Sequence, residues 1–192
     1  RGGRSAMTQL VVLAEEPSAC DLLEGLLPRI LPASWTFKCI PFEGKQDLEK
    51  RGPKFVKTWQ VPHARFVVVR DQDSADCVTL KQSLASRFAA IPSRRPLVRI
   101  VCRQLESWVL GDLAAFAEEF GVPSAHKHAG KAKYRSPDLL ANPIVELRHF
   151  VPGYQKRDGA RRLGRRLDPS RNRSTSFGVF CEGVRKLASG GP

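Results

Sequence analysis

Acidic residues follow three apolar segments of the chain, at or just beyond the point where each segment ends. They are Glu15 after the first segment, Asp71 and Asp73 after the second, and Glu106 after the third. Clustered carboxylates repel one another, and burial raises their pKa values unless a cation neutralises them. Hard oxygen ligands select Mg²⁺ or Mn²⁺ rather than zinc. The pattern therefore predicts a metal site in which the ion polarises a phosphate and activates water.

The pair Asp71 and Asp73 is the centre of this prediction. Alternate residues of an extended segment point to the same side, so both carboxylates can face one site. The competing interpretation is that acidic residues at strand ends only cap helices and keep loops soluble. An Asp-x-Asp pair alone is a weak motif, whereas Glu15 on one strand followed by the pair on a later strand is more specific.

The elements that must position these residues alternate between strand and helix. Apolar runs predict strands at 9–14, 35–40, 65–69 and 97–102. Helical periodicity between them favours βαβ units and a mainly parallel sheet with helices on both faces. Ligands bind at the carboxyl ends of the strands in such sheets, and the acidic residues fall there.

The intervening helices give three further expectations. Ser18 is expected to cap the first helix. The segment after the second strand is expected to hold two short helices, around 46–51 and 54–59. Apolar residues from Cys77 to Ile91 fall on one stripe and predict a helix over that span.

The chain is expected to form a single α/β domain over residues 7–190. Its α/β core is predicted at about 7–121, and a basic C-terminal annex of loops and helices at about 122–190. Residues 1–6 are interpreted as a tail or a cloning remnant. No apolar run approaches the roughly 18 residues that a spanning helix needs, so no membrane partner is expected.

The charge of the chain predicts an anionic partner. Its 192 residues include 32 Lys and Arg against 19 acidic residues, which gives a formal charge of +13. Nucleic acid is the commonest such partner, and phosphate contacts are blind to its sequence. The predicted contact residues are Lys45 and a basic stretch of the annex with Arg157, Arg161, Arg162, Arg165, Arg166, Arg171 and Arg173. The alternatives are an acidic protein partner, or a solvated face balanced by acidic neighbours.

The cysteines predict a compartment rather than a site. There are five of them, widely spaced and without a Cys-x-x-Cys pair. An odd number at such spacing favours buried free thiols in a reducing cytoplasm over a disulfide framework or a zinc site.

Six blocks of the sequence together resemble the bacterial DUF4276 family, and they extend from Met7 to Leu187. They are VVLAEEPSACDLLEGLLPRILP, PFEGKQDLEKR, RFVVVRDQDSADC, VRIVCRQLESWVLGD, PGYQKRDGARR and DPSRNRSTSFGVFCEGVRKL. The resemblance implies a Toprim-like fold, similar to the nuclease domains of the OLD (overcoming lysogenisation defect) proteins. Those proteins work beside ABC-type ATPases, often in phage defence.

The resemblance also implies roles for single residues. Glu15 matches the Toprim glutamate after the first strand, and Asp71 and Asp73 match its Asp-x-Asp pair. Glu106 is similar to a further acidic residue of OLD-type sites, and Lys156 is the candidate for their late catalytic lysine.

One position departs from the Toprim pattern. Many Toprim sites have an acidic residue four positions after the first glutamate, where this chain has Ala19. Either Glu16 or Asp21 substitutes for it, or the site holds only one tightly bound metal.

The sequence therefore predicts an Mg²⁺-dependent nuclease for DNA or RNA that works with an ABC/AAA-type ATPase. Whether it forms a homo-oligomer is left open. A haloacid-dehalogenase-like phosphatase is one rival, because an apolar strand precedes Asp-x-Asp. Phosphatases of that type have their nucleophilic aspartate on the first strand, and usually Thr or Val at the position where this chain has Ala75. The other rival is a non-catalytic basic subunit that tethers an ATPase to nucleic acid.

Overall fold

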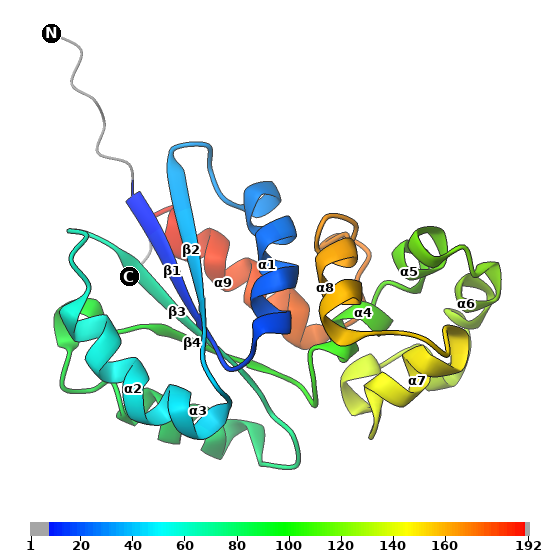
Figure 1. Ribbon diagram of the computed structural model, residues 1–192, viewed down its shortest axis with the longest axis horizontal. Coiled ribbons are helices and arrows are strands. Elements are labelled where there is room, and N and C mark those ends of the chain that lie inside the picture. The colour runs from blue at the N-terminus through cyan, green and yellow to red at the C-terminus, as the bar shows by residue number, and fades with distance from the viewer. Residues whose placement is uncertain (1–7, 191–192) are drawn as a thin grey trace, which may run out of the picture.

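A computed structural model of the protein describes residues 8–190. A parallel sheet forms its centre (Figure 1). The four strands lie in the order β2-β1-β3-β4, and each neighbouring pair is parallel. They are β1 (Thr8–Ala14), β2 (Trp35–Pro41), β3 (Arg65–Asp71) and β4 (Leu97–Val101). The α/β class and the parallel sheet are confirmed, and the architecture is consistent with the expected Toprim-like fold. The expected tail at 1–6, with residue 7, lies outside the described residues.

Helices cover both faces of the sheet (Figure 1). One face packs against α1 (Pro17–Ile30) and α9 (Thr175–Ala188), and the other against α2 (Lys45–Thr58) and α3 (Cys77–Ser86). Successive side chains of a strand alternate between the faces. In β3, Val67 and Val69 join the core on the α1 side, whereas Phe66 and Val68 join the core on the α2 side.

The remaining helices form the annex beside the sheet (Figure 1). They are α4 (Glu106–Leu110), α5 (Leu113–Phe120), α6 (Pro123–His128), α7 (Pro143–Phe150) and α8 (Lys156–Gly164), with short 3₁₀ turns at Pro92–Arg94, Ala132–Tyr134 and Pro137–Leu139. Leu163 of α8 and Phe177 of α9 are fully buried in the same hydrophobic cluster as Val67. The annex therefore shares one core with the sheet.

Three local expectations about the helices are wrong. Ser18 does not cap α1, because Glu16 is the cap residue and the Ser18 hydroxyl donates to its carboxylate. Helix α2 is continuous through Pro53, and the neighbouring Gly52 is buried against Phe88. Helix α3 ends at Ser86, so the apolar stripe predicted a helix that is too long.

The expectation that all cysteines are free thiols is also wrong. Cys20 of α1 and Cys39 of β2 form a disulfide, with their Cα atoms 5.5 Å apart. Cys77, Cys102 and Cys181 are free. The bond removes the argument from cysteines for a reducing cytoplasm, so the cytoplasmic location stays a prediction. Within residues 8–190, none of the helices combines the length and the apolar character needed to cross a membrane.

Candidate active site

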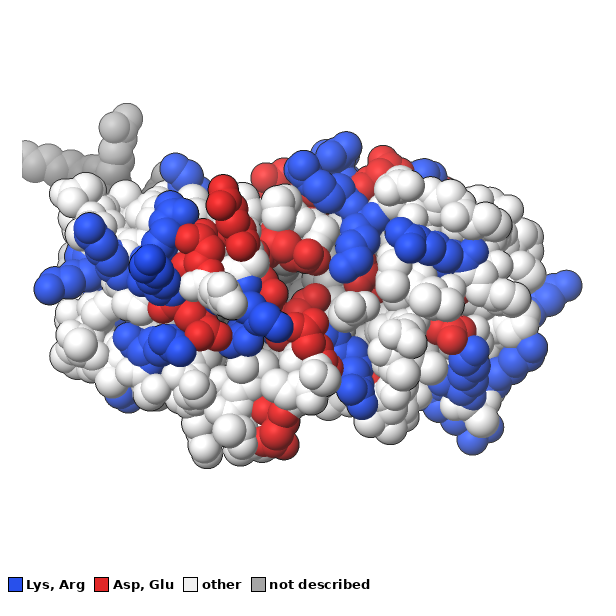
Figure 2. Space-filling model, turned by 60° about the horizontal axis from the view of Figure 1, so that its bottom comes forward, with Lys and Arg blue, Asp and Glu red and all other residues white. Residues whose placement is uncertain are grey.

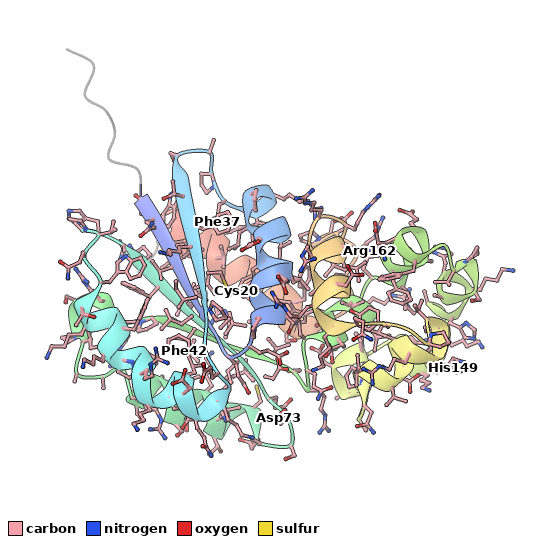
Figure 3. All side chains as sticks on the ribbon, in the orientation of Figure 1. Cys20, Phe37, Phe42, Asp73, His149 and Arg162 are labelled. Carbon is pink, nitrogen blue, oxygen red and sulfur yellow. A yellow bond between two sulfur atoms is a disulfide. The ribbon has the colours of Figure 1, made fainter. Side chains whose placement is uncertain are left out.

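The predicted acidic residues lie at the carboxyl edge of the sheet, but in two groups, with Asp71 near Glu106 in one and Glu15 near Asp73 in the other. Strand β3 ends at Asp71, and the backbone N–H of Glu15 donates to the Val69 carbonyl, which extends the β1–β3 pairing past Ala14. Figure 3 shows Asp73 beyond the carboxyl ends of the strands. Figure 2 shows acidic side chains gathered around a hollow near the middle of this face, with Lys and Arg on both sides of it.

Asp71 has the strongest electrostatic perturbation at this edge. Burial raises the pKa of its carboxyl well above the usual range, and the negative charges of Glu16, Glu106 and Glu15 raise it further. The positive charge of Lys156 acts in the opposite direction. Asp71 is thus surrounded by like charges that disfavour its ionised form.

Glu106 supplies a buried carboxylate from the first turn of α4. The residue is only 2% exposed, and its Oε2 atom has no hydrogen-bond partner. Burial raises the pKa of Glu106, although the nearby Lys156 lowers it. A buried acceptor without a partner is costly, which is typical of a site that binds a ligand.

Lys156 reaches these carboxylates from the annex, as the sequence predicts. It is the first residue of α8, and its Nζ atom lies 3.7 Å from Glu106 Oε2 and 3.8 Å from Glu16 Oε1. Burial acts to lower the pKa of Lys156, but the charges of Glu106, Glu16 and Asp71 outweigh it and the pKa is raised. The amine is therefore held in its charged form.

Glu16 belongs to the cluster, although the sequence suggested it only as a substitute for the acid missing at position 19. It is the largest like-charge contribution to the raised pKa of Asp71. Ala19 is buried in the core and cannot take this part, and Asp21 pairs with Arg157 at 2.7 Å instead. The doubled glutamate before Pro17 was the available signal, because the second of the two caps α1 beside the strand ends.

Glu15 lies mainly on the opposite face of the sheet from Asp71. Its position continues the alternation of Val11 and Leu13, which face α2. Its Oε2 atom is 3.8 Å from Arg70 Nε, and it also accepts from the backbone N–H of Asp71 at 3.3 Å. Glu15 therefore bridges the strand end between two groups of charges.

Arg70 is the cation of the second group, and the sequence analysis missed it. It is 9% exposed, and its guanidinium contacts Glu49 as well as Glu15. Burial and then the charge of Asp73 raise the pKa of Glu15, and the charge of Arg70 lowers it. Arg70 follows four apolar residues in β3, and an arginine at the end of such a buried run was the available signal.

The geometry expected of the Asp-x-Asp pair is wrong. Asp73 has a positive φ of 54°, and its backbone N–H donates to the Arg103 carbonyl, so the chain is not extended at this residue. Its carboxylate is 3.3 Å from Lys45 Nζ, which was expected to contact nucleic acid. The charge of Asp73 therefore interacts with Lys45 and Glu15 more strongly than with Asp71.

The donor set suits a hard divalent cation, because all its members are carboxylates. Between residues 8 and 190, no three Asp, Glu, His or Cys side chains are already close enough to hold one ion. Like charges repel one another, so a bound cation would have to offset this repulsion for three carboxylates to share it. The buried Glu106 oxygen that accepts no hydrogen bond and the raised pKa of Asp71 are the observations that fit a cation there.

The arginines of the annex do not form the free basic patch that the sequence predicts. Arg157 and Arg161 pair with Asp21 of α1, and Arg162 and Arg166 pair with Glu119 of α5. Arg162 projects from α8 towards α5 (Figure 3) and lies 4.2 Å from the centre of the Phe120 ring.

The other predicted contact residues are similarly engaged. Arg171 pairs with Asp112, which is almost fully buried, and Arg173 donates to the Ala129 carbonyl. Arg165 packs its side chain close to Gly25 of α1. Contacts to α1 in the sheet half come from Arg157, Arg161 and Arg165, and the other arginines contact α5 or the turn after α6. Their part in nucleic-acid binding stays a prediction.

Comparison with known proteins gives one match. The family model described as "Domain of unknown function (DUF4276)" matches residues 14–185. Neither a curated protein nor a solved structure matches the chain.

Proposed function

The chain belongs to the DUF4276 family, and we propose that it is an Mg²⁺-dependent nuclease that hydrolyses phosphodiester bonds of nucleic acid. The observation that carries this proposal is the carboxylate cluster of Asp71, Glu106 and Glu16, in which Glu106 is buried and the other two are partly exposed. The Asp71 pKa is raised well above its usual range, and the buried Glu106 Oε2 atom accepts no hydrogen bond, with Lys156 Nζ 3.7 Å away. Perturbed groups of this kind concentrate at functional sites.

Three residues would hold the ion, namely Asp71, Glu106 and Glu16, whereas Glu15 lies mainly on the other face of the sheet beside Arg70. A bound Mg²⁺ supplies Lewis-acid polarisation of a phosphate and a more acidic bound water. Within the cluster only Lys156 balances three carboxylates, so the site has an excess of negative charge that favours a divalent cation.

Lys156 would bind the phosphate that is attacked. Its raised pKa keeps the amine protonated, so it presents a positive charge where negative charge develops on the phosphate oxygens. Ser18 orients Glu16 by donating a hydrogen bond of 2.6 Å to its carboxylate. Arg70 keeps Glu15 at the strand end on the other side of β3.

The proposed substrate is DNA or RNA, because the formal charge of +13 favours a polyanion. The ABC/AAA-type ATPase partner and the part in phage defence rest on the resemblance to OLD-type proteins alone. We include both in this proposal.

A cleavage assay with matched variants tests the proposal. The purified chain is incubated with end-labelled single- and double-stranded DNA and RNA, in Mg²⁺, in Mn²⁺ and in EDTA. Cleavage is expected with the divalent ions only, and Asp71→Asn and Glu106→Gln are each expected to reduce it at least about 100-fold. Glu182→Gln, which removes an exposed carboxylate of α9 from a pair with Lys186, is the control and should cut normally.

Other outcomes favour the rivals. Cleavage that persists in Asp71→Asn would come from another site or from a contaminant. A covalent phosphate on Asp71 after trapping would favour a phosphatase. Binding without cleavage, with and without an added ATPase subunit, would favour the non-catalytic basic subunit. One observation favours this last rival: among residues 8–190, no three acidic, His or Cys side chains already lie close enough together to hold a metal ion.

A further inference from the structure

Helix α2 carries a row of exposed lysines along its outer face. Lys50, Lys54 and Lys57 are separated by four and three positions, so they lie on one side of the helix. All three are exposed, and none makes an ion pair with a residue of the described chain, 8–190. Five arginines of the annex, in contrast, are ion-paired, namely Arg157, Arg161, Arg162, Arg166 and Arg171.

The acidic residues of α2 do not neutralise this row. Asp47 pairs with Arg51 at 3.0 Å, and Glu49 turns to Arg70 and to Arg87 at the α3 side. The lysine row therefore presents a net positive surface to solvent.

The row runs between the two edges of the sheet. Helix α2 begins next to the carboxylates, where the Gly44 N–H donates to the Glu15 carbonyl and Lys45 contacts Asp73. Its other end lies at the amino edge, where Arg94 donates to the Val56 and Trp59 carbonyls. At about 1.5 Å per residue the helix is roughly 20 Å long.

Two hollows adjoin the far end of the row. One has a volume of 480 Å³ and is lined by Lys54, Lys57 and Arg87 together with apolar atoms. The other has a volume of 320 Å³, and its charged lining residues are Arg65, Arg94 and Arg95. Neither hollow has an acidic residue in its lining. At the end of the molecule away from the annex, Figure 2 shows basic side chains without acidic ones beside them.

We propose that the outer face of α2, with Lys50, Lys54 and Lys57, binds the phosphate backbone of the nucleic acid that enters the carboxylate site. The arginines at its far end extend the same surface. A strand of nucleic acid carries one phosphate per about 3.4 Å of duplex axis, so roughly three phosphates span the about 10 Å from Lys50 to Lys57. Regularly spaced cations on a rigid helix fit that periodic charge, and Lys45 connects the row to the acidic edge.

This inference rests on the proposed nuclease for the direction in which the substrate runs, but binding can be measured without cleavage. The full chain is titrated into labelled single- and double-stranded oligonucleotides in EDTA, and fluorescence anisotropy gives Kd at several salt concentrations. The test variant replaces Lys50, Lys54 and Lys57 with Gln. The control replaces Lys127, Lys131 and Arg135 with Gln, which removes the same charge from exposed positions of the annex.

The test variant is expected to bind about tenfold more weakly or worse near 0.1 M salt, and the log–log salt slope should fall by about 2–3. The control should change Kd less than about threefold. Circular dichroism spectra should show that both variants remain folded, because exposed Lys→Gln changes cost little in a helix.

Three results would overturn the inference. They are an unchanged Kd in the α2 variant, an equal loss in both variants, and binding of the wild type to vesicles of anionic phospholipid but not to oligonucleotides. If the wild type binds through α2 but cuts nothing with any divalent ion, the nuclease proposal fails and the inference stands. If the wild type cuts and the α2 variant binds normally, the inference alone fails.

Discussion

Asp71 ends β3 among other carboxylates, and burial together with the charges of Glu16 and Glu106 raises the pKa of its carboxyl well above the usual range. A carboxyl with such a raised pKa binds its proton more tightly in the folded than in the unfolded chain. The stability that it contributes is fully present below the unfolded-state pKa and is lost as the pH rises through the folded-state pKa. At neutral pH without a cation, this group therefore costs stability.

Asp71→Asn is accordingly expected to stabilise the protein at pH 7 in EDTA. We expect a gain of about 1 kcal/mol, or roughly 2–4 °C in Tm for a chain of this size. The gain should vanish near pH 3.5, below the unfolded-state pKa of an aspartate. Thermal denaturation followed by circular dichroism measures it, with Glu182→Gln as an exposed control. A loss of stability at pH 7 would show that the carboxylate is not electrostatically strained.

Replacing Arg70 should test the second group of charges, in which Arg70 pairs with Glu15 and Glu49. Arg70→Met leaves Glu15 and Glu49 without their buried cation, and breaking such a pair costs roughly 3–5 kcal/mol. Arg70→Lys keeps the charge and should lose less. The loss should shrink as the pH falls and the two carboxylates become protonated.

Urea denaturation of the Arg70 variants, compared with Arg87→Met, measures this effect. Arg87 pairs with the same Glu49 but is 45% exposed, so its replacement should cost about 1 kcal/mol or less. Equal losses for Arg70→Met and Arg87→Met would contradict the buried network.

Single residues differ in how far their sequence context predicted their place. Glu106 and Lys156 could be predicted because order along the chain and family resemblance placed both at the site. The partners of the annex arginines could not, since Arg157 and Asp21 are 136 positions apart and Arg162 and Glu119 are 43 apart. A basic stretch looks free in sequence when its counter-charges come from distant segments.

At the level of elements, α8 packs on α1 through glycines. A Cβ atom at Gly164 would overlap the Leu22 carbonyl, and one at Gly25 would lie 2.6 Å from the Gly164 carbonyl carbon. This close approach places Lys156, at the start of α8, over the strand ends.

Gly164→Ala is therefore expected to destabilise the protein by about 1–3 kcal/mol, because the overlap is with backbone that cannot rotate away. Gly178→Ala in α9 is the matched control. No atom lies within 4 Å of a Cβ at that position, so the change should stabilise the helix by about 0.5–1 kcal/mol. Urea denaturation of both variants tests the contact, and a loss in neither would contradict the tight α1–α8 packing.

The strands were predictable as elements and two helices were not. The central strands β1 and β3 are short apolar runs because they are buried on both faces, which leaves a clear sequence pattern. The edge strands β2 and β4 are less buried and keep a weaker pattern. Helix α2 was divided in error because Gly52 and Pro53 usually end helices, yet here Gly52 packs against Phe88 and Pro53 stays within the helix. Phe88 and Ile91 keep the helical apolar spacing beyond the end of α3, because both side chains are buried in the core on the α2 side.

For the molecule as a whole, charge is separated along the strands. Carboxylates gather at the carboxyl edge, and unpaired cations line α2 and the amino edge. A cation bound at the acidic edge would reduce repulsion within the cluster and would also allow a polyanion to approach along α2. Metal binding, stability and nucleic-acid affinity should therefore be linked.

The last prediction is that Mg²⁺ stabilises the folded chain through the carboxylate cluster. An ion that binds only the folded state adds about 2.7 kcal/mol when its concentration is 100 times Kd, which corresponds to roughly 5–10 °C in Tm. Thermal denaturation in MgCl₂, against NaCl of equal ionic strength, measures this shift. Asp71→Asn, already more stable in EDTA, should gain much less from Mg²⁺, because the variant lacks both the repulsion and the ligand. Equal Mg²⁺ shifts in the wild type and in Asp71→Asn would place the ion elsewhere, and no shift at millimolar Mg²⁺ would count against a resident metal.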